Sequence, residues 1–336
     1  MNHLIGKKVM HDVVNDRGVI IIPAKKVIRE QHLELCQLHN VDLFSVMLES
    51  DNGSISNPAS VLAQQVMEQS LFLFQSIRLN RKIPVLEFKN TILPVIDQIA
   101  EDPNIFRLLK AVRAKDEYTH RHNIGVAVIA TLIGKWIKME KTDLAALSLA
   151  GLLHDVGIVR IPLEMLNNEN IFREDEFEFF KQHTVYGYEM LKDTVGISNR
   201  VALAALQHHE REDGSGYPLG LDKDQVQPFS KIIAVADVFH AMYSKRPHHE
   251  PMPLSQIIKE LQMEGFGKLD PRIVSVFIKN LTNKLIGKQV LLTDGQKGSV
   301  VYMNPYEAGK PVIQVSSNHF IDLSRYRMLQ IKEIVS

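Results

Sequence analysis

The chain has 336 residues, of which 45% are hydrophobic and 23% are charged. This composition is ordinary for a soluble globular protein with room for one large domain and smaller ones. Its 39 basic and 39 acidic residues give a formal net charge of zero. A general binder of nucleic acid needs an excess of Lys and Arg, so we expect no DNA or RNA partner.

The single cysteine, Cys36, excludes an intramolecular disulfide, which fits a reducing compartment. It lies in an apolar-periodic stretch and is interpreted as a core residue. The N-terminal stretch lacks the charged start and apolar run of a signal peptide. No stretch approaches the ~20 consecutive apolar residues that span a bilayer. We therefore expect a cytoplasmic protein without a membrane span.

Residues 1–55 are predicted to form a small β/α module. Short β-branched runs occur between residues 3 and 28, and Asn15 to Gly18 has the composition of a hairpin turn. Residues 29–39 show helical periodicity. Residues 51–60, DNGSISNPAS, are small and polar with Gly and Pro, which is typical of a linker.

Residues 60–282 are predicted to form a helical domain, with connecting helices up to about residue 103. Apolar residues recur there at spacings of three and four. The expected helices are 60–79, 86–101, 104–115, 117–139, 142–154, 174–192, 198–209, 230–244 and 254–264. Residues 209–228 form one long loop rich in Gly and Pro, and such loops are often functional.

Residues 284–336 are predicted to form a small all-β module. Strand-like runs alternate there with turn residues, which suggests a barrel-like arrangement. The tetrapeptide LIGK occurs at 4–7 and again at 285–288, and whether the two β units are related is left open. The expected fold class is therefore mainly α, a helical bundle flanked by a small N-terminal β/α segment and a barrel-like C-terminal module.

Two pairs of metal-binding residue types stand at the ends of apolar helical stretches. His154 and Asp155 follow one, and their adjacency would let the carboxylate bridge two ions. His208 and His209 follow the other, just before the Gly-rich loop. Asp237 lies inside the apolar run KIIAVADVFHAM, where a carboxylate costs several kcal/mol unless it is paired or metal-bound.

His122 begins the apolar face of another helix, and His183 lies in a helical run one turn before Gly187. Taken singly, each histidine is also compatible with a structural role. Together the candidates combine imidazole and carboxylate donors without cysteine, which favours iron or manganese over a structural zinc site. The predicted metal ligands are His122, His154, Asp155, His183, His208, His209 and Asp237.

Six motifs in order resemble those of the HD-GYP phosphodiesterases, over about residues 105–280. They are D-x-Y-T-x-x-H at 116–122, HD-x-G at 154–157, K-x-H-x-x-x-G at 181–187, HHE-x-x-DGSGYP at 208–218, A-V-A-D-V-F at 234–239 and S-x-RP at 244–247. The resemblance implies a helical HD domain, two or three metal ions and cyclic di-GMP as substrate. It implies catalytic roles for His154 and Asp155.

The resemblance also implies a set of substrate contacts, namely Arg246, Tyr217, His249, Arg160 and Gly216. Three positions depart from the family pattern. Ile158 replaces a lysine expected to touch phosphate, with Arg160 as a candidate substitute, and His249 replaces a basic residue. Tyr118 stands where three-metal members have a glutamate. We therefore expect two divalent ions, iron or manganese, and no third.

The hypothesis that follows is hydrolysis of cyclic di-GMP to pGpG, with further cleavage to GMP left open. Two ions bridged by Asp155 would activate a shared water as hydroxide, and Arg246 would offset charge on the phosphoryl oxygens. One alternative is an HD-GYP domain with little or no turnover that binds a nucleotide or docks a partner. Another is a phosphohydrolase for a different cyclic dinucleotide. A homodimer or a signalling-protein partner is also left open.

Overall fold

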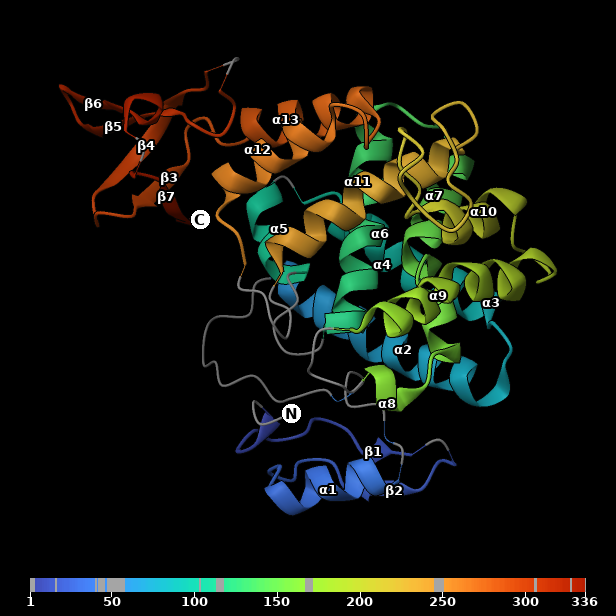
Figure 1. The fold of residues 1–336 in the computed structure, drawn as a ribbon. Helices are drawn as coiled ribbons and strands as arrows, with labels where there is room; N and C mark the ends of the chain where they lie inside the picture. Colours follow the sequence, from blue (N-terminus) through green and yellow to red (C-terminus); the bar gives the residue numbers. More distant parts are fainter. Residues whose placement is uncertain are drawn as a thin grey trace.

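Figure 1 shows a computed structural model of the chain. It describes residues 4–15, 17–39, 41, 46, 58–102, 104–112, 118–166, 172–244, 251–304, 307–326 and 328–335. Helices form the centre, with a small two-stranded sheet near the N-terminus and a five-stranded antiparallel sheet near the C-terminus. The mainly α fold class with two flanking β modules is confirmed.

The N-terminal module consists of β1 (Val13–Val14), β2 (Ile20–Ile22) and α1 (Glu30–Leu38). The two strands pair antiparallel as the predicted hairpin. The side-chain oxygen of Asn15 accepts the N–H groups of Arg17 and Val19 at 3.0 and 2.8 Å, which holds the turn. A core of its own, which includes Cys36, stabilises the module. Most of the predicted linker, residues 51–57, lies outside the described residues.

The helical domain is built around two buried helices, α6 and α7. Residues 122–134 of α6 are buried on every side, as expected for a helix at the centre of a bundle. The helical elements are α2 (Pro58–Asn80), α3 (Val85–Glu87), the π-helix η3 (Phe88–Ile92), α4 (Leu93–Ile99), α5 (Ile105–Val112), α6 (Tyr118–Trp136), α7 (Lys141–Leu153), the 3-10 helix η4 (Val156–Arg160), α8 (Leu163–Leu166), α9 (Glu174–Lys192), α10 (Asn199–Gln207), α11 (Pro228–Tyr243), α12 (Leu254–Glu264) and α13 (Pro271–Asn283).

One segment of the helical domain, Lys141–Arg160, is long and apolar enough to cross a bilayer by length and composition alone. This differs from the expectation that no stretch approaches that size. However, 61% of the segment is buried inside the protein. It contains α7 and η4, and its apolar character is accounted for by packing in the core of the bundle.

The C-terminal module consists of β3 (Gln289–Leu292), β4 (Lys297–Tyr302), β5 (Val312–Ser316), β6 (His319–Asp322), the 3-10 helix η5 (Leu323–Arg325) and β7 (Ile331–Val335). Its strand order is β6-β5-β4-β3-β7. The prediction of a barrel-like module is wrong, because β6 and β7 remain the edges of an open sheet. Val290, Val300 and Ile313 of this sheet belong to the same buried cluster as the helices.

The two LIGK tetrapeptides adopt the same local structure. The glycine has φ of 83° in the first copy and 82° in the second, a conformation that favours glycine. In the first copy its N–H donates to the carbonyl of Ile28, and in the second to that of Val300 in β4. In each copy the N–H of that same residue donates back to the lysine carbonyl. The two β units therefore share a turn, although they belong to different cores.

Helix α13 is absent from the predicted helices, although its start carries a clear signal. Asp270 is the N-cap and accepts the N–H groups of Arg272 and Ile273 at 2.9 and 3.3 Å, and Pro271 occupies the first helical position. Burial acts to raise the pKa of the Asp270 carboxyl. The hydrogen bonds from Arg272 and Ile273 outweigh burial, so the pKa lies below its usual value.

We predict that Asp270→Ala lowers the free energy of unfolding by about 1–2 kcal/mol at pH 7, because it removes the N-cap. The carboxyl pKa is lower in the folded than in the unfolded state, so the stabilisation is complete above the unfolded value of about 3.9 and is lost as pH falls through the folded value. Urea unfolding from pH 7 to 3 should show the two proteins converging. Asp294→Ala, in an exposed turn, serves as the control, and a difference independent of pH would contradict the account.

Candidate metal centre

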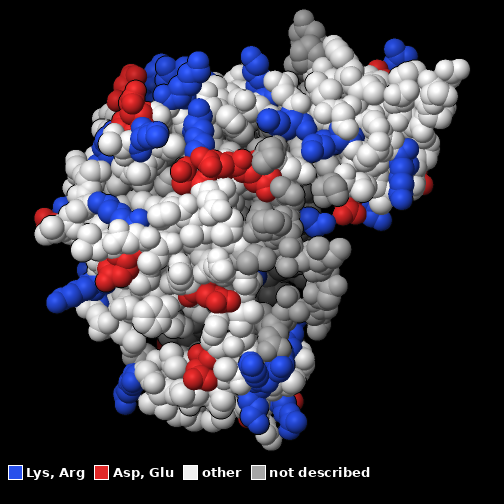
Figure 2. Space-filling model, turned by 180° about the vertical axis from the view of Figure 1, so that it is seen from behind, with Lys and Arg blue, Asp and Glu red and all other residues white. Residues whose placement is uncertain are grey.

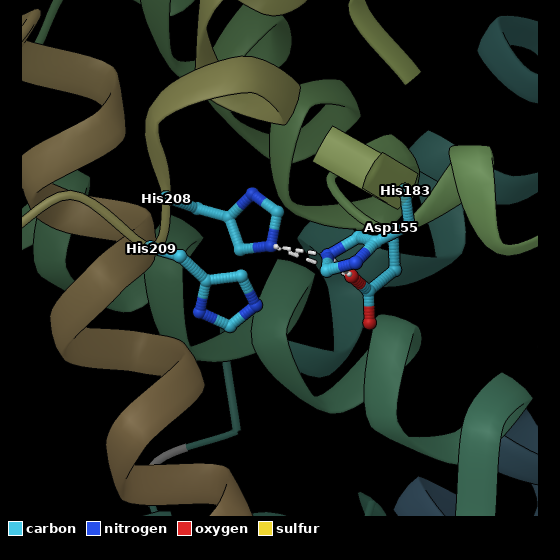
Figure 3. A group of neighbouring side chains, drawn as sticks. All are labelled: Asp155, His183, His208 and His209. Atoms are coloured by element: carbon cyan, nitrogen blue, oxygen red, sulfur yellow. Dashed lines mark hydrogen bonds and ion pairs between the residues drawn. The ribbon is translucent and has the colours of Figure 1, made fainter. Parts of the chain in front are cut away.

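Two helices end at the same place and deliver the two pairs of candidate ligands there. Helix α7 ends at Leu153 and is followed by His154 and Asp155, and α10 ends at Gln207 and is followed by His208 and His209. The C-terminal end of a helix carries a partial negative charge, which favours a cation nearby. Figure 3 shows Asp155, His208 and His209 converging there, together with His183 of α9.

Close packing between η4 and α9 brings His183 to this point. Gly157, in η4, lies so near the carbonyl of His183 and the N–H of Gly187 that a side chain would collide with both. Position 157 therefore has room only for glycine. The same contact sets the distance between Asp155, two residues before Gly157, and the His183 ring.

The first group of ligand atoms comprises Asp155, His183, His208 and His209. The Nε2 atoms of His183 and His208 lie 3.3 and 3.4 Å from Oδ1 of Asp155, and 3.5 Å from each other. Ligands bound about 2.1 Å from one ion, at tetrahedral or octahedral angles, lie roughly 3.0–3.4 Å apart. These spacings therefore fit a shared ion.

The second group comprises His122, His154 and Asp237. Nε2 of His122 lies 3.0 Å from Oδ1 of Asp237. Nε2 of His154 is fully buried without a hydrogen-bond partner and lies 3.4 Å from Oδ2 of Asp155. Asp155 thus presents one carboxylate oxygen to each group, which is the arrangement expected of a carboxylate that bridges two ions.

Backbone carbonyls fix the protonation of three of these rings. The Nδ1 atoms of His154, His183 and His208 lie 2.8, 2.7 and 2.9 Å from the carbonyl oxygen three residues earlier in the chain. A carbonyl only accepts, so each Nδ1 carries the proton and donates it. In the neutral ring Nε2 is then left with a lone pair directed into the centre, as in metal-ligating histidines.

His122 is oriented by another histidine, His240. Nε2 of His240 lies 3.1 Å from the carbonyl oxygen of Val112 and must donate to it, so its Nδ1 accepts from Nδ1 of His122 at 3.0 Å. This leaves Nε2 of His122 to face Asp237. His240 is completely buried, and it fits only because Gly125 of α6 lacks a side chain.

The pKa values of the buried groups favour the ligand forms. Burial lowers the pKa of His154 to about 4 and that of His209 well below its usual value. Burial acts to raise the pKa of Asp237, but the neighbouring His122 outweighs burial, so the pKa lies below its usual range. For Asp155, burial is likewise outweighed by the surrounding histidines, so its pKa lies well below its usual range. The lone pairs of neutral imidazoles repel the carboxylate oxygens that they face unless a cation lies between them. These residues therefore fit divalent ions.

The loop after His209 forms one rim of the centre. The Glu210 carboxylate accepts the N–H groups of Leu219 and Leu221 at 2.7 and 2.9 Å, which folds the loop back. Gly216 packs against Glu210 and Arg211 so closely that a side chain would collide with their backbone. Tyr217 stacks on His209, with ring centroids 4.6 Å apart. The predicted substrate contacts Tyr217 and Gly216 therefore lie beside the metal ligands.

The other predicted substrate contacts are placed differently. The Arg160 guanidinium pairs with Glu189 at 2.8 Å and lies over the Tyr186 ring, so its partners are on α9 rather than among the metal ligands. Arg246 and His249 lie outside the described residues, as do Glu117 and the side chain of Tyr118, so the third-metal position is not described. All seven predicted metal ligands are described and meet at one centre.

Two neighbours of Tyr217 are absent from the predicted substrate contacts: Phe177, and Lys181, which the sequence identifies only as the first position of the K-x-H-x-x-x-G motif. Both lie on α9, and the Lys181 ammonium is 5.0 Å from the centroid of the Phe177 ring and 5.4 Å from that of Tyr217. Their spacing of four residues places them on one helix face. This spacing, just before His183, is the sequence signal that could have identified the two residues.

A family model described as an HD domain matches residues 97–273, more than half of the chain. The chain belongs to the HD domain family. Its helical bundle, with the His154–Asp155 pair at the end of a buried helix, is therefore the HD domain that the sequence motifs predicted.

Curated relatives of this HD domain protein include two cyclic di-GMP phosphodiesterases. PA4108 of Pseudomonas aeruginosa is 27% identical over 76% of this chain and 62% of its own length. One from Thermotoga maritima is 36% identical over 52% of this chain and 49% of its own length. The 3'3'-cGAMP-specific phosphodiesterase 1 of Vibrio cholerae is 33% identical over 52% of this chain and 40% of its own length. The chain thus spans between two-fifths and about three-fifths of the length of these relatives.

A solved structure shares the fold. Bd1817 of Bdellovibrio bacteriovorus, titled a HDG"Y"P protein, superposes with a TM-score of 0.55 at 15% identity, covering 83% of this chain and 96% of Bd1817. At this identity the match supports the fold of the HD domain protein alone.

We predict that Mn²⁺ raises the Tm of protein stripped with EDTA. An ion that binds only the folded state stabilises it by about 2.7 kcal/mol at a hundredfold excess over Kd, and calorimetry measures the shift. His183→Ala should lose most of it, whereas His319→Ala, exposed on β6, should retain it. Equal Tm values with and without Mn²⁺ would count against a metal centre.

We also predict that His240→Ala weakens Mn²⁺ binding by about 10- to 100-fold, because His122 loses the partner that orients its ring. Isothermal titration well below the Tm of the variant measures the Kd. His39→Ala, exposed at the end of α1, is the control. An unchanged Kd in a folded His240→Ala protein would show that His240 does not position His122.

Proposed function

We propose that this HD domain protein is a cytoplasmic, metal-dependent phosphodiesterase that hydrolyses cyclic di-GMP to pGpG. The observation that carries the proposal is the position of Asp155, whose two carboxylate oxygens face two separate groups of ligand atoms. Relatives named as cyclic di-GMP phosphodiesterases support the choice of substrate.

The ligand groups are suited to two divalent ions, and we propose iron or manganese. Donors limited to imidazole and carboxylate favour these ions over a structural zinc site. His122, His154 and Asp237 would hold one ion, His183, His208 and His209 the other, and Asp155 both. Ions bound there supply Lewis acidity, which lowers the pKa of water and polarises a phosphoryl oxygen.

The chain itself contributes order and burial to this reaction. The backbone carbonyls and His240 keep the Nε2 atoms unprotonated, so the ligands need no rearrangement before a phosphodiester binds. Tyr217 covers His209 at the rim and limits water on that side. Burial raises the pKa of the Tyr217 hydroxyl, and the nearby carboxylates add to the effect, so the ring stays neutral.

A charge distribution without a dominant sign agrees with a small-molecule substrate. Figure 2 shows Lys and Arg side chains interspersed with Asp and Glu over one face of the molecule. Binding of a long nucleic acid depends on many phosphate contacts made by a continuous basic surface, which this face does not present among the described residues.

A second candidate substrate is 3'3'-cGAMP. Relatives from Vibrio cholerae that are named as specific for it are 30–33% identical to this chain. Both cyclic dinucleotides present the same two phosphodiesters, so the same metal centre could act on either. The two differ in one base, and selection between them lies with residues that contact the bases.

We predict that metal-loaded protein converts cyclic di-GMP to pGpG and that Asp155→Asn lowers kcat by at least about 10²-fold, since the residue shared by both ligand groups is impaired. Chromatography of the products, with 3'3'-cGAMP tested in parallel, measures turnover, and elemental analysis should give two metal ions per chain. Asp193→Asn, just beyond α9, is the matched control. Wild-type protein with two bound ions that cleaves neither dinucleotide would refute the proposed function.

A further inference from the structure

An exposed aromatic ring and a lysine lie side by side at the rim of the metal centre. The Lys181 ammonium lies 5.0 Å from the ring centroid of Phe177 and 5.4 Å from that of Tyr217. The two rings stand edge to face, with centroids 6.4 Å apart and planes at 79°. The cation therefore lies over both aromatic rings. We call Phe177, Lys181 and Tyr217 the aromatic–lysine cluster.

The aromatic–lysine cluster is continuous with the metal ligands. The Tyr217 ring that contacts Lys181 and Phe177 is also stacked on His209, and its centroid lies 6.4 Å from that of His183. A phosphodiester at the ligands would therefore place its attached nucleoside beside these three residues.

Packing does not account for the exposure of Phe177, and Lys181 retains hydrogen-bonding capacity. The Phe177 side chain is 43% exposed, although burial of a phenylalanine is favourable. Lys181 is about one-quarter exposed and donates to Glu178 at 2.6 Å. An ammonium has three N–H donors, so this one bond leaves capacity for an anionic oxygen.

We propose that Phe177 and Lys181 form a nucleotide subsite of the active centre, which takes one purine base and the phosphate that is not being cleaved. Phe177 offers a face on which a base stacks, and stacking on an aromatic side chain tolerates any base. Lys181 provides a point charge for the second phosphate. This inference rests on the proposed function and adds to it the residues that grip the substrate.

The subsite also supplies a phosphate-binding cation in place of the one that Ile158 replaces. Ile158 stands where the sequence resemblance implies a phosphate-binding lysine, and Arg160 is paired with Glu189. Lys181 reaches the rim from α9 instead of η4. The charge that offsets substrate phosphate would thus come from α9 instead of η4.

The test compares cyclic di-GMP hydrolysis by metal-loaded Phe177→Ala and Lys181→Gln proteins with that of wild type. Each variant should raise KM about tenfold, with kcat within about twofold, because stacking and a charge-assisted phosphate contact are lost while the metal ligands are intact. Phe177→Trp should retain the wild-type KM. Bis(p-nitrophenyl) phosphate, which has one phosphate and no purine, should be hydrolysed with unchanged kcat by every variant.

Two matched controls come from the same helix. Phe179→Ala removes an aromatic ring that is 39% exposed two positions away. Lys192→Gln removes a lysine that also lies over a ring, that of Tyr188 at 5.9 Å, near the far end of α9. Both should leave KM for cyclic di-GMP unchanged.

The outcomes separate the subsite from the proposed function. Wild-type protein that hydrolyses cyclic di-GMP while Phe177→Ala and Lys181→Gln keep its KM would overturn the subsite alone. An equal rise in KM in the two control variants, or a loss of kcat on both diesters, would also overturn it, since the effect would then reflect damage to α9. Wild-type protein that binds metal but cleaves no cyclic dinucleotide would overturn the proposed function itself.

Discussion

The structure depends on one electrostatic constraint, the convergence of lone pairs around the Asp155 carboxylate. Unprotonated nitrogens of His183 and His208 face one of its oxygens, and that of His154 faces the other, all at 3.3–3.4 Å. In the absence of a cation these atoms repel one another in a buried site. Because the Nδ1 atoms of these rings already donate to backbone carbonyls, the neutral rings carry no proton on the nitrogens that face Asp155, so the arrangement is organised for divalent ions.

The surrounding fold supports this convergence by placing rigid helices on every side. Two buried helices end at the centre and direct the negative ends of their dipoles to it, while α6, α9 and α11 supply the remaining ligands from their interiors. Close contacts at Gly125 and Gly157 leave little freedom for these helices to shift. The apolar core around them stabilises an arrangement that the site alone would oppose.

The substrate side of the centre is arranged differently from its metal side. Most of the metal ligands are buried, and backbone carbonyls hold three of their rings, whereas Phe177, Lys181 and Tyr217 lie at the rim. Such a division lets one metal centre serve different cyclic dinucleotides, because specificity then depends on the few side chains that contact the bases. The names of the relatives, which include both cyclic di-GMP and 3'3'-cGAMP enzymes, fit this division.

The sequence by itself determined the seven ligand candidates, the helices that carry them and the β character of both ends, because these depend on residue type and local periodicity. Helix α13 was also readable from Asp270 and Pro271. Only the tertiary structure decided how the ligands divide into two groups and that His240 orients His122. It also decided that Arg160 forms an ion pair with Glu189 and that Lys181 contacts the Tyr217 ring. The open C-terminal sheet is likewise a finding of the tertiary structure. Each of these depends on distances between segments far apart in the chain, and helix packing, not local pattern, sets such distances.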